Sequence, residues 1–316
     1  MTIMPPRTPP RPIDIAAVFP ELAAYARKAT RLHPRPGEPG PHESSVGGPL
    51  LWPADEPWPC GEPHDDQAYH QSVDAERRRR RILAGGPVIT AEQQEELQRL
   101  GELDAKVDAG APAVMLAVAQ LYTRDVPGLE GPPGADVLQV LWCPRDHEPG
   151  YCPVVTVRWR RSSDVVDPLP EQPEPEVMDE DMYLPEPCVL HPEEIVEYPD
   201  GNFMPSELYE RITAWEETGE YSYQYELSNA PGWKVGGHTT WSLSGYEPIH
   251  CGECGAGMEM LLAIASYERD EMRSWWPEGA GNADAAPTRV QIGRGSELLV
   301  FTCPESFDHP PKTAVQ

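Results

Sequence analysis

The chain has 316 residues, with 52 acidic and 25 basic side chains and a formal net charge of -27. A surface this acidic repels nucleic acids and anionic membranes and attracts basic partners. We therefore expect neither nucleic acid nor a membrane as a partner. A hydrophobic content of 39% with nine tryptophans predicts a folded core, and seven cysteines without regular spacing argue against a secreted disulfide framework.

Residues 1–40 are predicted to form a Pro-rich tail followed by a helix. The first twelve residues hold five prolines and two arginines and lack an apolar signal core. No run approaches the roughly 20 apolar residues of a membrane span, so we expect a cytoplasmic protein with reduced thiols. Apolar residues recur at helical spacing over residues 13–30, where Pro20 can divide the helix into two pieces.

Residues 41–163 are predicted to form a β-rich repeat with a helical insertion at 65–110. Within the insertion, one helix is expected over 66–83, and a capping box begins a second helix at Thr90, so the two form a hairpin. Five consecutive arginines, Arg77 to Arg81, resemble a nucleic-acid patch. They cannot all share one helix face, and in so acidic a chain we expect them to pair with the protein's own acids or with a partner. Short strands are expected at 114–122, 137–142 and 153–159.

Residues 164–204 are predicted to be an acidic, Pro-rich linker. Between Asp164 and Asp200 the sequence contains thirteen acidic residues and no Lys or Arg. Such a segment buries too little apolar area to offset the entropy of ordering it, so we expect most of it to be flexible. Cys188 and His191 lie inside it and are expected to be solvated.

Residues 205–316 are predicted to form a second β-rich repeat. A helix begins at Ser206, and tyrosines alternate over 221–225 as in a strand. The segment from His250 to Gly255 then places two cysteines, in a CxxC spacing, between turn-forming glycines. This is the sequence of a metal-binding knuckle.

Four features recur in the same order in both halves, which predicts an internal duplication. The matching pairs are Val46-Gly47-Gly48 with Val235-Gly236-Gly237, Cys60 with Cys251, Leu116 to Ala119 with Leu262 to Ala265, and Leu138 to Pro144 with Leu298 to Pro304. A histidine, His147 or His309, follows the last feature in each half. We therefore expect an α+β, β-rich fold of two pseudo-repeated lobes of antiparallel sheet, with an N-terminal helix and a helical-hairpin insertion.

The second lobe offers Cys251, Cys254, Cys303 and His309 as a candidate metal site. Three thiolates and one imidazole suit tetrahedral zinc, and His250 competes with His309 for the fourth position. The alternative is that Cys303 is simply buried as a small apolar residue, as free cysteines commonly are.

The matching first-lobe set is Cys60, His64, Cys143 and His147, with Cys152 spare and without a CxxC motif. Cys143 with His147 is also a candidate nucleophile and base. However, a Cys-Pro pair at the end of both repeats favours a structural position, and the sequence has no GxSxG, HExxH or P-loop motif.

The Gly-Gly-Pro-Leu-Leu-Trp-Pro segment at 47–53, the CxxCG before an apolar strand, and the strand that ends in Cys-Pro resemble the bacterial YwqG-like family, whose members lack an assigned biochemical function. The second half is more distantly similar to the eukaryotic programmed cell death protein 2 family, zinc-containing chaperones of a newly made small-subunit ribosomal protein. The resemblance covers roughly residues 30–160 and 205–310.

Two hypotheses about function follow. In the first, the protein is a non-enzymatic, acidic binding module that sequesters a basic protein, either a toxin, as an immunity protein, or a newly made basic protein, as a chaperone. The charge and the resemblance both favour it. In the second, the protein is a metal- or thiol-dependent enzyme, which an open metal position beside a deep cleft would favour.

Overall fold

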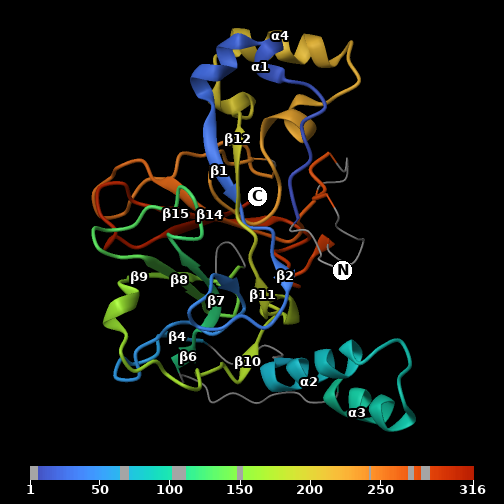
Figure 1. Ribbon diagram of the computed structural model, residues 1–316, viewed down its shortest axis with the longest axis vertical. Coiled ribbons are helices and arrows are strands. Elements are labelled where there is room, and N and C mark those ends of the chain that lie inside the picture. The colour runs from blue at the N-terminus through green and yellow to red at the C-terminus, as the bar shows by residue number, and fades with distance from the viewer. Residues whose placement is uncertain are drawn as a thin grey trace.

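Two six-stranded antiparallel sheets form the body of the protein, with helices at both ends of its long axis (Figure 1). The structure, a computed structural model, describes residues 6–64, 71–101, 112–147, 152–241, 243–269, 274–278 and 285–316. Within these ranges the fold is α+β and rich in strands, as the sequence predicts.

The two sheets exchange strands between the halves of the chain. The first has the order β2 (Arg35–Pro36), β11 (Cys188–Val189), β3 (Ser45–Val46), β7 (Leu116–Tyr122), β8 (Val137–Trp142) and β9 (Val155–Arg160). The second has the order β12 (Glu193–Glu197), β1 (Arg27–Arg31), β13 (Lys234–Gly236), β14 (Glu259–Ala265), β15 (Glu297–Thr302) and β16 (Lys312–Val315). Two short strand pairs complete the fold: β4 (Cys60–Pro63) with β6 (Pro112–Val114), and β5 (Gln71–Ser72) with β10 (Val177–Met178).

One antiparallel ribbon, residues 27–36 paired with residues 188–197, passes from one sheet to the other. Between the two sheets, the amide of His191 donates to the carbonyl of Leu32 at 2.9 Å. The register of the ribbon is the same in both sheets and places His33 opposite His191 between them. By strand order, β1 in the second sheet occupies the place of β11 in the first, and β12 occupies the place of β2. The paired residues run from Arg27–Glu197 to Arg31–Glu193 in the second sheet, and are Arg35–Val189 and Pro36–Cys188 in the first.

The hydrogen-bond register supports the predicted duplication. Val46 pairs with Ala119 as Val235 pairs with Leu262. The glycine after each valine has a positive φ, 63° at Gly47 and 65° at Gly236, a conformation that favours glycine. β8 and β15 correspond residue for residue, so Cys143 and Cys303 follow equivalent strand ends.

The predicted match of Leu116 to Ala119 with Leu262 to Ala265 is wrong by three residues. A β-bulge interrupts the pairing in both lobes, between Ala117 and Ala119 and between Met260 and Leu262, so Leu116 corresponds to Glu259. Both runs are apolar, and only pairing with the neighbouring strand sets the register.

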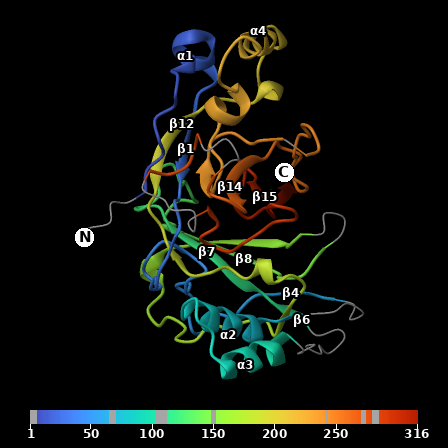
Figure 2. The same ribbon diagram turned by 90° about the vertical axis from the view of Figure 1, so that its right-hand side faces the viewer.

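A single hydrophobic core joins the two sheets. Val118, Leu138 and Val140 of the first sheet and Leu262 and Val300 of the second are buried in one cluster. Figure 2 shows β14 and β15 beside β7 and β8. The two lobes are therefore packed against each other.

At one end of the molecule, α1 (Ile15–Val18), the 3-10 helix η1 (Pro20–Tyr25) and α4 (Ser206–Glu216) form a cap (Figure 1). The helix predicted over residues 13–30 is wrong in its last part, because residues 27–31 form β1. The strand predicted at 221–225 is also wrong. Tyr223–Ser228 form a turn of π-helix, η5, which buries Tyr223 among the apolar residues of the cap.

At the other end lies the predicted helical hairpin, formed by α2 (Val73–Ala84) and α3 (Ala91–Gly101) (Figure 1). The capping box is present: the amide of Gln93 donates to the hydroxyl of Thr90, and the amide of Thr90 donates to the side chain of Gln93. The predicted helical parts at 65–70 and 102–110 lie outside the described residues. The arginine run serves the fold: Arg77 pairs with Glu174, Arg78 with Glu96, Arg79 with Glu76 and Asp181, and Arg80 with Glu76 and Glu186.

Residues 164–204 are not a flexible linker. They supply β10, β11 and β12, and three 3-10 turns lie at η2 (Ser162–Asp164), η3 (Asp181–Tyr183) and η4 (Gly201–Phe203). Val177, Met178, Leu184 and Cys188 are buried. The cations that this segment lacks come from distant parts of the chain: α2 pairs with Glu174, Asp181 and Glu186, Arg145 with Asp179, Lys28 with Glu194, and Lys234 with Glu197.

The ion pair of Lys234 and Glu197 is buried in the second sheet. The two side chains are 2% and 0% exposed, and Lys234 Nζ lies 2.8 and 3.0 Å from the two carboxylate oxygens. The amides of Ala230 and His238 donate to the same carboxylate at 2.9 Å. Every polar atom of the carboxylate is therefore satisfied without water.

We expect Glu197→Ala to destabilise the protein by about 3–5 kcal/mol, because it leaves a buried ammonium group without a partner. The matched control is Glu194→Ala on the same strand, whose partner Lys28 is exposed and whose loss should cost less than about 1 kcal/mol. Equilibrium unfolding in urea measures both. Equal costs would show that the buried pair contributes no more than a surface pair.

Candidate metal centre

A tight turn before β14 presents two cysteine sulfurs. The amide of Cys251 donates to the carbonyl of Ala256 at 2.8 Å, and the amide of Gly255 donates to the carbonyl of Cys251 at 3.0 Å. Gly255 has a φ of 73°, which side chains other than glycine rarely adopt. The glycine-flanked CxxC sequence therefore forms the predicted knuckle.

The four predicted ligands meet at one point. Cys303 follows β15, and His309 lies in the next loop; His309 Nδ1 is 3.3 Å from both Cys251 Sγ and Cys303 Sγ, and Cys254 Sγ is 3.5 Å from Cys303 Sγ. All four ligand atoms lie within 4.8 Å of one another. In a tetrahedral site with metal–sulfur bonds of about 2.3 Å, neighbouring ligand atoms are about 3.8 Å apart. The cluster can therefore hold a metal ion.

The surroundings of the cluster favour deprotonated sulfur. The backbone amide of Cys254 points at the sulfur of Cys251 and lowers the pKa of that thiol. Burial opposes ionisation of Cys303, but hydrogen bonds from His309 and from nearby backbone amides lower its pKa to about 6. The hydrogen bond with Cys303 in turn raises the pKa of His309. The pKa of Cys254, in contrast, is raised. A hydrogen bond from the backbone amide of Ala256 lowers it, but the contacts with Cys303 and Cys251 outweigh this effect. Two of the three sulfurs therefore favour thiolate, the form that binds a metal.

His250, the alternative fourth ligand, does not join the cluster. Its side chain is exposed and lines a separate cavity of about 570 Å³ together with Trp241 and Phe301. His309, and not His250, is therefore the histidine of the cluster.

The first lobe holds a smaller group of the same kind, formed by His64, Cys143 and His147. His64 Nε2 lies 3.2 Å from Cys143 Sγ, the two imidazole rings are 4.6 Å apart, and one ligand atom of each residue lies within 4.8 Å of the others. Burial raises the pKa of Cys143 to about 11 and lowers the pKa of His147. Cys60, the fourth member predicted from the sequence, is exposed and outside the group.

The predicted match of Cys60 with Cys251 is wrong by one residue. Cys60 bridges to Val114 as His250 bridges to Gly257, and Val114 and Gly257 are equivalent by the register of β7 and β14. Cys60 therefore corresponds to His250, and a shift of one residue turns a side chain to the other face of a strand.

The residue that corresponds to Cys251 is Gly61. A Cβ atom built on Gly61 would lie 3.7 Å from Cys143 Sγ, so a side chain at this position would point into the first-lobe group. No pattern in the cysteines could have identified this position, because the residue that marks it is a glycine.

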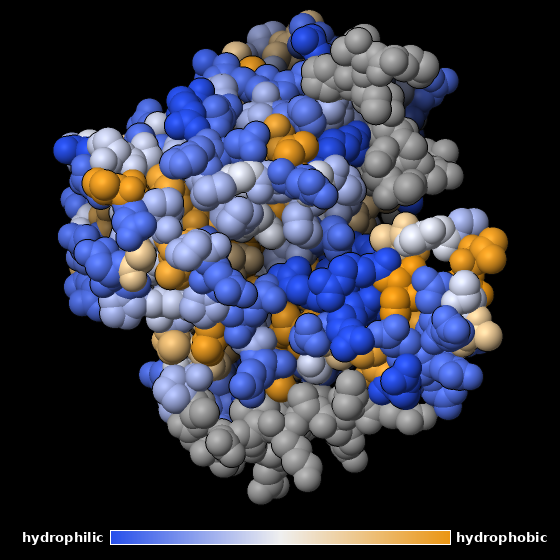
Figure 3. Space-filling view, turned by 60° about the horizontal axis from the view of Figure 1, so that its bottom comes forward, coloured by the Kyte–Doolittle hydropathy of each residue, from blue (hydrophilic) through white to orange (hydrophobic). Residues whose placement is uncertain are grey.

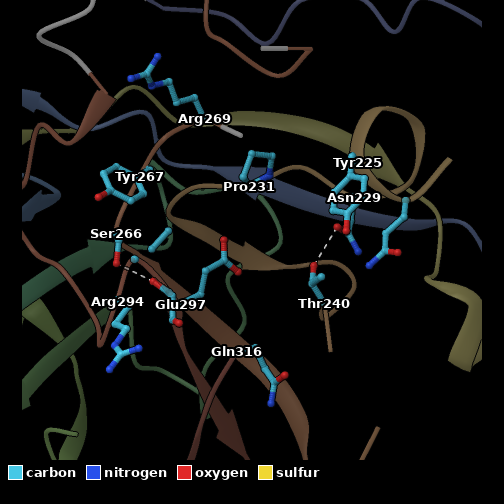
Figure 4. Close-up of a pocket in the computed structure, with 14 residues that line it drawn as sticks. Tyr225, Asn229, Pro231, Thr240, Ser266, Tyr267, Arg269, Arg294, Glu297 and Gln316 are labelled. Carbon is cyan, nitrogen blue, oxygen red and sulfur yellow. Dashed lines mark hydrogen bonds between the residues drawn. The ribbon is translucent and has the colours of Figure 1, made fainter. Parts of the chain in front are cut away.

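A cavity of about 680 Å³ lies in the second lobe, away from the cluster. Tyr267 and Arg269 lie on one side of it and Tyr225 and Asn229 on the other (Figure 4). It opens at the end of β14 and the beginning of β15, whereas the cluster lies at the other ends of these strands. Because a strand rises about 3.4 Å per residue, the cavity and the cluster are roughly 20 Å apart along the sheet.

No helix in the described ranges has both the length and the apolar composition needed to cross a membrane. No protein-family model matches the chain, and no curated protein matches it significantly. The similarity to the YwqG-like family therefore stays a prediction that depends on the short motifs alone.

Proposed function

We propose that this protein is a zinc-stabilised, non-enzymatic binding module that sequesters a basic protein. The observation that carries the metal assignment is the ligand set: Cys251, Cys254, Cys303 and His309 supply the four ligands of a tetrahedral ion. Structural zinc sites are closed in this way, whereas catalytic sites have three protein ligands and a water molecule. Three thiolates and one imidazole also select zinc over hard cations such as magnesium.

The position of the cluster supports a structural role for the ion. An ion bound there would join the knuckle before β14 to the end of β15 and to the loop of His309. The 680 Å³ cavity is roughly 20 Å away, too far for such an ion to act on a molecule bound there.

The distribution of charge supports a basic partner. Residues 164–220 contain 18 acidic residues and a single basic one, Arg211. Several of these acids pair with cations of the fold, but Glu207 and Glu210 of α4 face solvent. The face that carries the α2–α3 hairpin is mostly hydrophilic, with its hydrophobic residues in separate patches (Figure 3).

One side of α4, together with the residue that caps its C-terminus, forms what we call the acidic face: Glu207, Glu210 and the cap Glu217, all exposed. They are spaced three and seven residues apart, so they lie side by side along the helix. Leu208 and Ile212 are buried on the opposite side. The helix is thus held by its apolar side while the three carboxylates remain free to attract cations.

The alternative, a metal- or thiol-dependent enzyme, is favoured by one observation, the three-ligand group of the first lobe. In that group burial raises the pKa of the only thiol, Cys143, which disfavours a thiolate nucleophile. We therefore prefer the binding function. A toxin and a newly made basic protein share the chemistry that this surface would recognise.

We expect the double variant Cys251→Ser/Cys254→Ser to remove one zinc ion per chain and to lower the stability of the protein. If free zinc stands at 1,000 times its Kd, the lost ion contributed about 4 kcal/mol, which lowers the melting temperature by about 6 °C. Elemental analysis and thermal unfolding with and without a chelator measure both effects. The matched control is His250→Ala, one residue away and exposed, which should change neither. Wild-type protein that is metal-free, or whose unfolding is indifferent to chelation, would refute the zinc assignment.

We also expect the captured partner to be basic. Its association rate should fall by about tenfold or more between 50 and 500 mM salt. The reason is that charge attraction acts over about 8 Å at physiological ionic strength and over a shorter distance at high salt. Neutralising the acidic face with Glu207→Gln, Glu210→Gln and Glu217→Gln should slow association several-fold. Surface plasmon resonance with the purified partner measures both rates.

The charge-matched control neutralises three exposed acids elsewhere, Glu38, Glu92 and Glu95. It changes the net charge equally and should slow association much less. Neutral or acidic partners, or equal effects of the two triple variants, would contradict recognition by the acidic face.

A further inference from the structure

We propose that His64, Cys143 and His147 of the first lobe form a second zinc site, weaker than the cluster of the second lobe, whose fourth ligand is a small molecule or ion from solution. This site is separate from the one that the proposed function uses. The inference depends on geometry within the first lobe and on its correspondence with the second.

The first observation is position. Cys143 and Cys303 follow corresponding strands, β8 and β15, and each is followed by a proline. His147 lies in the loop after Cys143, as His309 lies in the loop after Cys303. Both groups therefore occupy the same end of equivalent sheets, and the first repeats the second with one histidine, His64, and one glycine, Gly61, in place of two cysteines.

The second observation is an unsatisfied nitrogen. His147 Nε2 is buried and has no hydrogen-bond partner among the described residues. Leaving such an atom without a partner costs free energy, and buried polar groups are rarely left so. A metal ion between the two imidazoles and the sulfur of Cys143 would satisfy it.

The ligand set indicates how tightly the site binds. Two neutral imidazoles and one thiolate carry a charge of -1, against -3 for the three thiolates and one imidazole of the second lobe. Among the described residues the group also has three ligands where the other has four. Gly61 occupies the place of the missing sulfur, so a water molecule or another small ligand completes the tetrahedron. On binding, Cys143 releases its proton to solvent as the metal–sulfur bond forms.

The test counts ions in the full-length chain. Metal-free protein is titrated with zinc against a chromophoric chelator. We expect wild type to bind two ions with distinct affinities, and the double variant Cys251→Ser/Cys254→Ser to bind one, at the weaker affinity. The double variant leaves only Cys303 and His309 in the second-lobe cluster, so counting in it isolates the first lobe, and failure of the second-lobe site would not affect the result.

Within the Cys251→Ser/Cys254→Ser background, His64→Gln should abolish binding, whereas Cys60→Ser should bind as its parent does. Gly61→Cys supplies the missing sulfur and should tighten binding by at least about tenfold, since it adds a fourth ligand. Circular dichroism and thermal unfolding confirm that each variant is folded; if His64→Gln does not fold, the gain in Gly61→Cys decides the question. No binding in the Cys251→Ser/Cys254→Ser background, binding that survives His64→Gln, or no gain in Gly61→Cys would each overturn the proposal.

Cobalt(II) tests the fourth position. In the Cys251→Ser/Cys254→Ser background, azide should shift the visible absorption of bound cobalt, because it replaces the solvent ligand. In the same background with Gly61→Cys, the spectrum should be insensitive to azide. A spectrum that azide leaves unchanged in both proteins would refute an exchangeable fourth ligand.

Discussion

The paired segments 27–36 and 188–197 hold the whole structure together, because each leaves one sheet and enters the other in an unbroken antiparallel register. Neither lobe can complete its sheet alone. In the second sheet the buried pair of Lys234 and Glu197 joins β13 to β12 across β1, so the ribbon is held by an ion pair as well as by backbone hydrogen bonds. Breaking such a pair is costly, which ties the second lobe to a strand contributed by the middle of the chain.

The same constraint explains how the protein carries its charge. The acidic segment after residue 164 is ordered because its apolar residues enter both sheets and because arginines of α2, far away in the sequence, neutralise its carboxylates. Three further exposed acids, Glu207, Glu210 and Glu217, lie along α4 and its C-terminal cap. A metal ion in the second lobe would stiffen the end of the sheet opposite the 680 Å³ cavity. A rigid scaffold that displays fixed carboxylates is suited to capturing a basic surface, since less conformational entropy is lost on binding.

The sequence predicted what depends on local pattern. The hairpin of α2 and α3, the knuckle at Cys251 and Cys254, and the strands that end in Cys143 and Cys303 follow from caps, glycines and alternation. The sequence failed to predict structure that depends on distant residues. The composition of residues 164–204 indicates disorder, but pairing in both sheets and distant partners such as Arg80 and Lys234 order the segment. Leu32-His33-Pro34 and Leu190-His191-Pro192 are a repeat visible in the sequence that marks both crossing segments. The first-lobe ligand set was wrong at Cys60 because a shift of one residue reverses the side of a strand.

The central claim is that a closed, four-ligand zinc ion holds the second lobe and plays no part in catalysis. Anomalous diffraction from a crystal of the protein, recorded above and below the zinc absorption edge, tests it most directly. The account predicts a peak between Cys251, Cys254, Cys303 and His309, with three sulfurs at about 2.3 Å, one nitrogen at about 2.0–2.1 Å, and no water in the coordination sphere. The absence of a peak there, or an ion that binds a water molecule in place of one of the four side chains, would contradict it.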